Sequence, residues 1–207
     1  GATKAGTEGP GNYHLYLFDR VSGELRQHLL GLPNVINHLC FSRDGGYLAA
    51  SLGGDGIRVW ATDGWRQVAS DSEYGDASHW CDFDAKGHLV TTSLDGQIRL
   101  YDGQFHLAAK RAAPGGQEPF AVAFSPDGTR IAFSRQIGGR LEEVERCFWK
   151  WCFTLPAKPH WRLGIVTVSD GALTEPPSAE ISLAPTWSPN GRRIVYHDEQ
   201  GLAWLDL

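Results

Sequence analysis

Two cysteines and a histidine in the second half of the chain are residue types that bind zinc. Cys147 and Cys152 are separated by four residues, and His160 follows shortly after them. A structural zinc site is tetrahedral and takes four such ligands, the first two typically two to four residues apart. A fourth ligand is missing from this segment, so we expect no metal site here.

Acid–base and nucleophilic chemistry has weaker candidates. Glu142, Glu143 and Glu145 are clustered, but neighbouring carboxylates on one polar face are usually just solvated. The Gly-x-Ser-x-Gly motif of hydrolases is absent from the sequence. The Gly-rich residues 53–56 open a predicted strand, so anion binding at a helix terminus does not apply. We therefore expect no catalytic residues, no cofactor and no enzyme activity.

The bulk composition also excludes several classes of protein. The net charge is −5 and no run of Lys and Arg stands out, which argues against nucleic acid as a partner. No apolar run reaches the roughly 20 residues that span a bilayer, so we expect no membrane insertion. The four cysteines form no recognisable disulfide framework. This favours a reducing compartment, the cytoplasm, with the periplasm as the alternative.

A hairpin pattern is repeated along the chain. Each copy has an aromatic residue at the end of an apolar run, a short polar turn with a Gly, and a second β-rich run. In such turns Pro presets φ, Asp or Asn bonds the local backbone, and Gly accepts a positive φ. The aromatic residues lie at steps of 42, 41 and 63 residues and are Phe41, Phe83, Phe124 and Trp187. The first two steps match the roughly 40–45 residues of a four-stranded propeller blade.

Further strands are predicted around each hairpin. Third strands follow a Gly at residues 56–60, 96–102 and 201–206, and outer fourth strands fit 65–69, 105–109 and 172–175. Residues 13–19 and 24–29 have the form of third and fourth strands of an earlier unit. His38 and His79 occupy nearly matching places on first strands. They could line a central channel, although packed strand histidines are the commoner case.

Two of these units resemble WD repeats. Residues 89–102, LVTTSLDGQIRLYD, are the most similar, with Tyr101 and Asp102 where that family has its Trp-Asp pair. Residues 48–61 keep Trp60, while Ala61 replaces the Asp. The closing unit, 187–207, looks more like the propeller of the TolB family. The resemblance implies an all-β propeller of four-stranded antiparallel blades, and it implies no particular function.

The resemblance also implies structural roles for particular side chains. Family members often carry a Gly-His pair that bonds the Asp of the second turn and the Trp of the third strand. The matching turn residues here are Asp55 and Asp95, and no Gly-His precedes either unit. We therefore expect an incomplete hydrogen-bond tetrad and looser blades, with the structural positions at Asp55, Trp60, Asp95, Tyr101 and Asp102.

The predicted strands make about four and a half blades, whereas propellers typically have 4–8. We expect a flexible N-terminal segment at 1–12 and blades over 13–207, in a ring that this chain does not close. The chain begins with Gly and contains no Met, which favours a piece of a longer protein. An open ring has unpaired edge strands that another chain can complete.

The longest step contains an irregular, Trp-rich insert at about 135–162. Residues 139–146 and 148–155 are the third and fourth strands of the blade in one arrangement. In the other, which we favour, 163–169 is the third strand and the insert bulges out, because 165–171 has a strand-then-turn form.

Aromatic residues are concentrated in this insert, at Phe148, Trp149, Trp151, Phe153 and Trp161. On a loop they would form an exposed apolar patch of the kind that binds protein partners. Alternatively, they cover the blade edge as a small additional core.

The sequence therefore favours a non-catalytic protein–protein interaction scaffold, as a piece or subunit of a larger protein or assembly. The alternative is an accessory propeller of an enzyme, of the peptidase or signalling type, whose catalytic part is not in this sequence. An enzyme in its own right would require His, Asp or Glu side chains from three or more blades to converge on one point.

Overall fold

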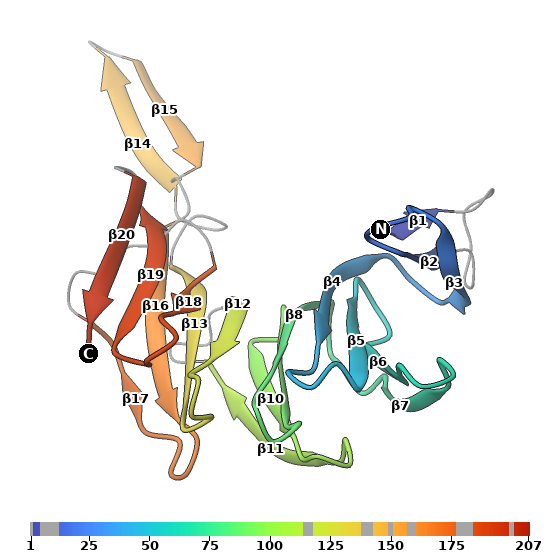
Figure 1. Ribbon diagram of the computed structural model, residues 1–207. Coiled ribbons are helices and arrows are strands. Elements are labelled where there is room, and N and C mark those ends of the chain that lie inside the picture. Colours follow the sequence, from blue (N-terminus) through green and yellow to red (C-terminus); the bar gives the residue numbers. More distant parts are fainter. Residues whose placement is uncertain are drawn as a thin grey trace.

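The computed structural model describes residues 2–4, 13–113, 118–137, 143–148, 151–156, 160–176, 184–198 and 201–207. All regular elements in these ranges are β-strands, arranged in five antiparallel sheets and one separate hairpin (Figure 1). The described residues contain no helix that is long and apolar enough to cross a membrane. Residues 1 and 5–12, most of the segment predicted to be flexible, lie outside the described residues.

The first three sheets are simple meanders. Sheet 1 contains β1 (Ala2–Lys4), β2 (Tyr13–Phe18) and β3 (Leu25–Leu32). Sheet 2 contains β4 (Ile36–Phe41), β5 (Tyr47–Leu52), β6 (Ile57–Ala61) and β7 (Gln67–Asp71). Sheet 3 contains β8 (Ser78–Phe83), β9 (Leu89–Ser93), β10 (Gln97–Tyr101) and β11 (Leu107–Ala112).

The insert interrupts sheet 4. This sheet contains β12 (Pro119–Phe124), β13 (Arg130–Ile137), β16 (His160–Thr167) and β17 (Leu173–Thr174). Between β13 and β16 the chain forms a separate hairpin of β14 (Glu143–Phe148) and β15 (Trp151–Pro156). Strand β16 pairs with β13 from Arg130↔Thr167 to Ile137↔His160, so it is the third strand of the sheet. The hairpin projects from the rest of the molecule in Figure 1.

Sheet 5 ends the chain with β18 (Thr186–Trp187), β19 (Arg193–Asp198) and β20 (Gly201–Asp206). The sheets follow one another in chain order and form an open arc, with sheets 1 and 5 at its two ends (Figure 1). This is the architecture of an incomplete β-propeller of about four to five blades, as predicted.

The turns between first and second strands follow the repeated sequence pattern. In sheet 2 the Ser42 hydroxyl donates to the Asp44 carboxylate at 2.6 Å, and the Tyr47 N–H donates to Ser42 Oγ at 2.8 Å. Gly45 has a φ of 74°, which a residue with a Cβ rarely adopts. The same arrangement recurs in sheets 4 and 5, at Ser125, Asp127 and Gly128 and at Ser188, Asn190 and Gly191. Local hydrogen bonding thus fixes where each hairpin turns.

Second strands are buried on both faces because their side chains alternate between two neighbouring sheets. On β5, Leu48 packs with Leu15 of sheet 1, whereas Ala49 packs with Phe83 of sheet 3. The side chains of β9 alternate in the same way between sheets 2 and 4, and those of β13 alternate between sheets 3 and 5. The core is therefore a series of layers between successive sheets.

Sheet 5 breaks this pattern on one face. Ile194 packs against sheet 4, but its neighbour Val195 is 37% exposed. Trp204, which pairs with Val195, is 61% exposed, and Leu202 is 78% exposed. Sheet 5 thus carries an uncovered apolar face, defined by Val195, Leu202 and Trp204, on the side away from sheet 4.

The contact between β13 and β16 leads to a stability prediction. Gly164 lies opposite Phe133, and an added Cβ would lie 2.4 Å from the end of that buried ring. We expect Gly164→Ala to lower the free energy of unfolding by about 1–3 kcal/mol, because the ring must shift within a packed layer. Urea denaturation measures this. At Gly103 an added Cβ would have its nearest contact at 3.6 Å, so Gly103→Ala is the control. Equal losses in both variants would contradict the packing described.

Candidate functional site

The first strands of four consecutive sheets enclose a central pocket of about 680 Å³. Strands β4, β8 and β12 supply most of its wall, and residues around β18 supply the rest. This follows from the layered core, since sheets stacked face to face bring their first strands side by side. The central pocket is therefore the place where side chains from different sheets meet.

Aromatic rings from three sheets form a continuous row beside this pocket. The His38 imidazole stacks on Trp80, with ring centres 3.9 Å apart and an angle of 21°. Trp80 lies 6.0 Å from Phe120, and Phe120 lies 5.3 Å from Trp161. All four residues are partly exposed. We call His38, Trp80, Phe120 and Trp161 the aromatic row.

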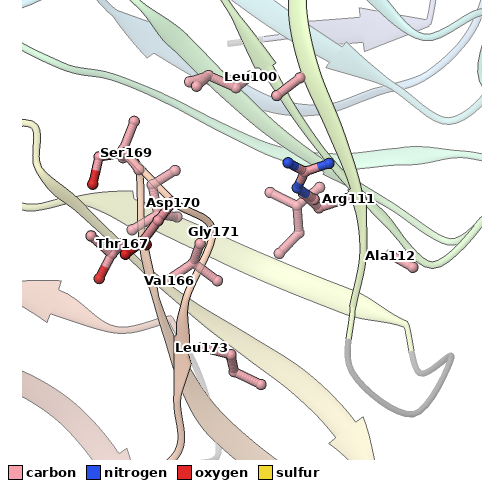
Figure 2. A pocket seen from close by; sticks show the side chains of 13 residues that line it. Leu100, Arg111, Ala112, Val166, Thr167, Ser169, Asp170, Gly171 and Leu173 are labelled. Carbon is pink, nitrogen blue, oxygen red and sulfur yellow. The ribbon is translucent and has the colours of Figure 1, made fainter.

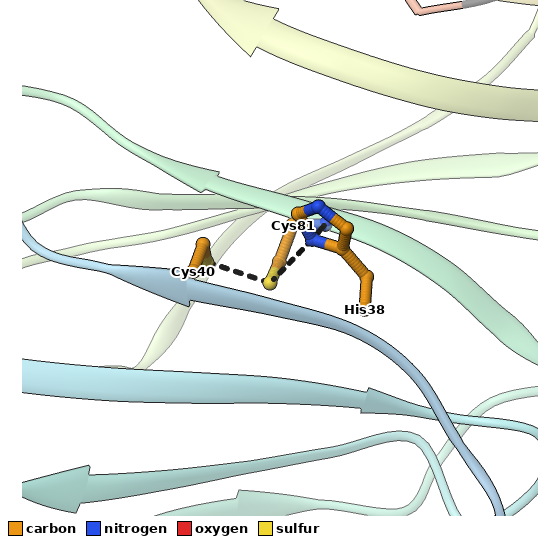
Figure 3. Close-up of side chains that lie close together, drawn as sticks. All are labelled: His38, Cys40 and Cys81. Carbon is orange, nitrogen blue, oxygen red and sulfur yellow. Dashed lines mark hydrogen bonds between the residues drawn. The ribbon is translucent and has the colours of Figure 1, made fainter. Parts of the chain in front are cut away.

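Two cysteines and one histidine converge on the same wall (Figure 3). The Sγ atoms of Cys40 and Cys81 are 2.6 Å apart, and Nδ1 of His38 is 3.5 Å from Cys81 Sγ. Both thiols are free, Cys81 is buried, and Cys40 and His38 are partly exposed. The group joins neighbouring first strands, since His38 and Cys40 lie on β4 and Cys81 lies on β8.

The two thiols differ in acidity. Burial raises the pKa of Cys40 well above its usual value, and its contact with Cys81 raises it further. Burial also acts to raise the pKa of Cys81, but the hydrogen bond from Cys40 and the His38 imidazole outweigh it and lower the pKa to about 6. These contacts favour the thiolate form of Cys81 over that of Cys40.

Polar contacts connect three sheets along this wall. The Phe124 N–H of sheet 4 donates to the Asp82 carboxylate of sheet 3 at 2.8 Å. Arg43 of sheet 2 lies 3.8 Å from the same carboxylate and donates to the Phe83 carbonyl at 3.1 Å. Burial raises the pKa of Asp82. These contacts cross three sheets and hold their first strands in register.

A second, smaller pocket of about 180 Å³ lies between sheets 3 and 4 (Figure 2). Its walls are mainly apolar and come from β10, β11, β16 and the turn before β17. Arg111 and Asp170 are its charged lining residues. It carries no cluster of converging polar groups, so it is a gap in the packing between the two sheets.

The structure places the predicted blade positions in a hydrogen-bond network in sheet 3. The Tyr101 hydroxyl donates to Asp71 of sheet 2 at 2.7 Å and lies 2.8 Å from the Tyr74 hydroxyl. Tyr74 also bonds the Thr91 hydroxyl at 2.7 Å. The turn residue Asp95 accepts the N–H of Gly75 at 3.1 Å. In place of the expected Gly-His pair, Tyr74 and Gly75 thus connect the second turn and the third strand.

A buried ion pair completes this network. Arg99 is 1% exposed at its side chain and binds the Asp95 carboxylate. Its guanidinium also lies 3.9 Å above the Tyr74 ring. Burial raises the pKa of Asp95, but hydrogen bonds from Arg99, Ser93 and Gly75 outweigh it and hold the pKa well below its usual range.

The other predicted blade positions have local roles. Trp60 is buried in the layer between sheets 1 and 2. Asp55 is a turn residue with a φ of 64°, and its backbone carbonyl accepts from Arg58 at 2.8 Å. Asp102 caps the next turn by accepting the N–H groups of Gln104 and His106, each at 2.9 Å.

The predicted partner residues fall in two places. Trp161 lies at the end of the aromatic row and packs partly against the core between sheets 4 and 5. Phe148 and Trp151 are cross-strand neighbours in the β14–β15 hairpin, and Phe153 pairs with Arg146 in the same hairpin. Only the backbone of this hairpin is described. Trp149 lies outside the described residues. A role in partner binding stays a prediction for all five aromatic residues.

The residues considered for chemistry are similarly divided. Cys147 and Cys152 are direct cross-strand partners in the hairpin, and His160 begins β16. Glu143 and Glu145 belong to β14, while Glu142 lies outside the described residues.

Of the two matching histidines, His38 joins the thiol pair, while His79 lies 4.7 Å from the Phe120 ring. Sequence reasoning missed Cys40 and Cys81. The available signal was the spacing of His38 and Cys40, which places both on one face of a strand.

The buried ion pair leads to a pH-dependent prediction. We expect Asp95→Asn to lower the free energy of unfolding by about 3 kcal/mol near neutral pH, because the Arg99 charge stays buried without its partner. Because the pKa of Asp95 is lower in the folded than in the unfolded protein, its ionised form stabilises the fold fully at pH values above the unfolded pKa of about 3.9. This contribution to the free energy of unfolding is lost as the pH falls toward the folded-state pKa.

The difference between Asp95→Asn and the unsubstituted protein should therefore shrink from pH ~7 to pH ~3 in urea denaturation. Asp55→Asn, at the matching turn of sheet 2, is the control and should change little. A pH-independent difference for Asp95→Asn would contradict the ion pair's role.

Comparison with known proteins agrees with this architecture. Residues 21–61 match the family model of the WD domain, G-beta repeat. No curated protein matches the chain. The matched residues run from the turn before β3 through β4, β5 and β6, so the sequence repeat starts on the outer strand of one sheet and continues into the next. The TolB-like character of the last unit stays a prediction. One segment of the chain thus matches a WD repeat, and the antiparallel sheets form an incomplete β-propeller.

Proposed function

We propose that this chain is a non-catalytic protein–protein interaction scaffold, and that a partner polypeptide docks along the aromatic row and the β14–β15 hairpin. The observation that carries the proposal is the continuous row of partly exposed rings contributed by three adjacent sheets. The WD repeat supports an interaction role in general terms, and it does not locate the docking surface.

The aromatic row has the chemistry of a binding hot spot. Trp and Tyr anchor many protein interfaces because they bury a large apolar area while losing little side-chain freedom. Here the rings of Trp80, Phe120 and Trp161 support one another, so they are held in place before a partner arrives. The Arg43–Asp82 pair adds a polar edge beside them, as in interfaces with an apolar centre and a polar rim.

The hairpin extends this surface because of where it leaves the blade. It is inserted between Ile137, at the end of β13, and His160, at the start of β16, which are cross-strand partners. Pro119, next to Phe120, pairs with Arg135 at the same end of the sheet. The aromatic row and the base of the hairpin therefore share one end of sheet 4, and one partner can contact both.

The titratable groups in the central pocket support a non-catalytic role. Among the described residues that line it, His38, Cys40 and Arg43 come from sheet 2, and Cys81 and Asp82 come from sheet 3. Sheets 4 and 5 contribute apolar residues, such as Val122 and Trp187, together with the small polar side chain of Thr186. The convergence of acidic and basic groups from three or more blades that channel catalysis would require is not found there.

The uncovered face of sheet 5 supports a second contact. Val195, Leu202 and Trp204 present apolar side chains where a further blade would pack in a continued propeller. Propellers avoid such exposed faces by closing their ring. We propose that a sheet from another chain covers this face.

Photo-crosslinking tests the docking surface. Phe41 is 52% exposed and lines the central pocket. A photoreactive residue at Phe41 should give one discrete protein adduct in an extract of the source cells. The same residue at His106, whose side chain is 80% exposed in the turn before β11, is the control and should give none.

Substitutions then locate the contact. Trp161→Ala, and separately the pair Trp149→Ala with Trp151→Ala, should each reduce the adduct about tenfold, since one hot-spot side chain contributes more than about 1 kcal/mol. Equal adducts at Phe41 and His106 would refute the docking surface. An adduct unchanged by the pair of hairpin substitutions would remove the hairpin from it.

Light scattering tests the uncovered face. We expect the protein from its native source to have a mass above that of one full-length polypeptide. Trp204→Glu should lower that mass without loss of β structure, because a charge on this face opposes apolar packing. Leu107→Glu, at a 48% exposed position on the outer strand β11, is the matched control and should keep the mass. A native mass equal to one full-length polypeptide would contradict ring completion by another chain.

A further inference from the structure

The scaffold role does not require two thiols and an imidazole at this wall of the central pocket. One imidazole nitrogen and two sulfur atoms lie within 4.8 Å of one another, and they come from two different sheets. Thiolate and imidazole are the ligands that thiophilic cations such as Zn²⁺ take in proteins. Apolar side chains would be sufficient for packing at these positions, as Leu39 is on the same strand.

We propose that His38, Cys40 and Cys81 form a binding site for a thiophilic cation of the Zn²⁺ kind, with its fourth coordination position open to the central pocket. The site would link sheets 2 and 3 through their first strands. It shares His38 with the aromatic row, which uses the face of that ring, whereas the cation would use its Nδ1 atom.

The spacing of the donor atoms is close to what a tetrahedral centre needs. Metal distances of about 2.3 Å to sulfur and 2.0–2.1 Å to nitrogen place the two donor atoms about 3.5 Å apart. His38 Nδ1 and Cys81 Sγ are 3.5 Å apart. The two sulfur atoms, now 2.6 Å apart, would have to separate by about 1 Å, since tetrahedral thiolates lie about 3.7 Å apart. A small rotation of the partly exposed Cys40 side chain can provide this.

The imidazole is already oriented for ligation. Its ring is held by stacking on Trp80, and its Nδ1 atom accepts the Cys81 N–H at 3.4 Å. Nδ1 thus faces Cys81 and lies 3.5 Å from its Sγ atom (Figure 3). Metal sites depend on this kind of orientation by surrounding groups.

The pocket provides access to the three donors. His38, Cys40 and Cys81 all line it, so a cation can reach them without opening the fold. Asp82, next to Cys81 in the chain, lines the same pocket, where it is paired with Arg43. Three protein ligands with one open position leave room for water or for a donor group on a bound molecule.

Cobalt substitution tests the proposal directly. Co²⁺ is added to the reduced, metal-free protein, and the absorption spectrum is recorded. We expect one Co²⁺ per chain, with visible d–d bands of a tetrahedral centre and a near-ultraviolet thiolate-to-cobalt charge-transfer band. Zn²⁺ should displace the cobalt and protect Cys40 from alkylation.

Variants identify the ligands. Cys40→Ser and His38→Gln should each weaken binding at least about 100-fold, since loss of a mere outer-shell partner already costs about 10–100-fold. The matched control replaces the other two cysteines, with Cys147→Ser and Cys152→Ser together, and should bind cobalt as the unsubstituted protein does. Circular dichroism confirms that each variant is folded.

Three results would overturn the proposal. The first is the absence of a charge-transfer band in the reduced protein. The second is a band that survives Cys40→Ser or disappears in the Cys147→Ser, Cys152→Ser control. The third is a Cys40–Cys81 disulfide in protein prepared without reductant, together with no metal binding after reduction, which would make the pair a redox element.

Discussion

The structure depends on one packing constraint, which is that a strand buried on both faces needs a neighbouring sheet on each side. The second strands β5, β9 and β13 satisfy it by alternating their side chains between the sheet before and the sheet after. Sheets 2, 3 and 4 therefore each lie between two other sheets, and the series forms an arc (Figure 1). Strand β19 meets the constraint on one face only, through Ile194, and leaves Val195 exposed on the other. The uncovered face of sheet 5 is a direct consequence of the same rule that builds the core.

The same stacking explains why a site exists at all. Side chains on the first strands come from residues far apart in sequence, and face-to-face sheets bring them to one wall. Cys40 and Cys81 are 41 residues apart and in contact, and Trp80 and Phe120 are 40 residues apart with their ring centres 6.0 Å from each other. The aromatic row and the thiol pair are therefore two products of one arrangement. A partner or a cation bound there would contact neighbouring sheets and hold them together.

Much of the fold could be predicted from the sequence because its determinants are local. The Ser-x-Asp-Gly turns carry their own hydrogen bonds and a positive φ at Gly, so their hairpins were recognisable. The placement of β16 as a third strand followed from its strand-then-turn form. The thiol pair could not be predicted with the same ease, since its distance depends on how two sheets stack. Likewise, the absence of a Gly-His pair indicated an incomplete tetrad, but Tyr74 connects Thr91 and Tyr101 in a way that only the packed sheets reveal.

Hydrogen exchange, compared between the isolated chain and its complex from the native source, tests the central claim that the first-strand surface of the propeller binds protein. We expect slower exchange in the complex for peptides that cover β4, β8 and β12 and the hairpin between Ile137 and His160. Peptides from the outer strands β7 and β11 should exchange at the same rate in both samples. Slower exchange that is confined to the outer strands, with none on the first strands, would contradict protein binding at the first-strand surface.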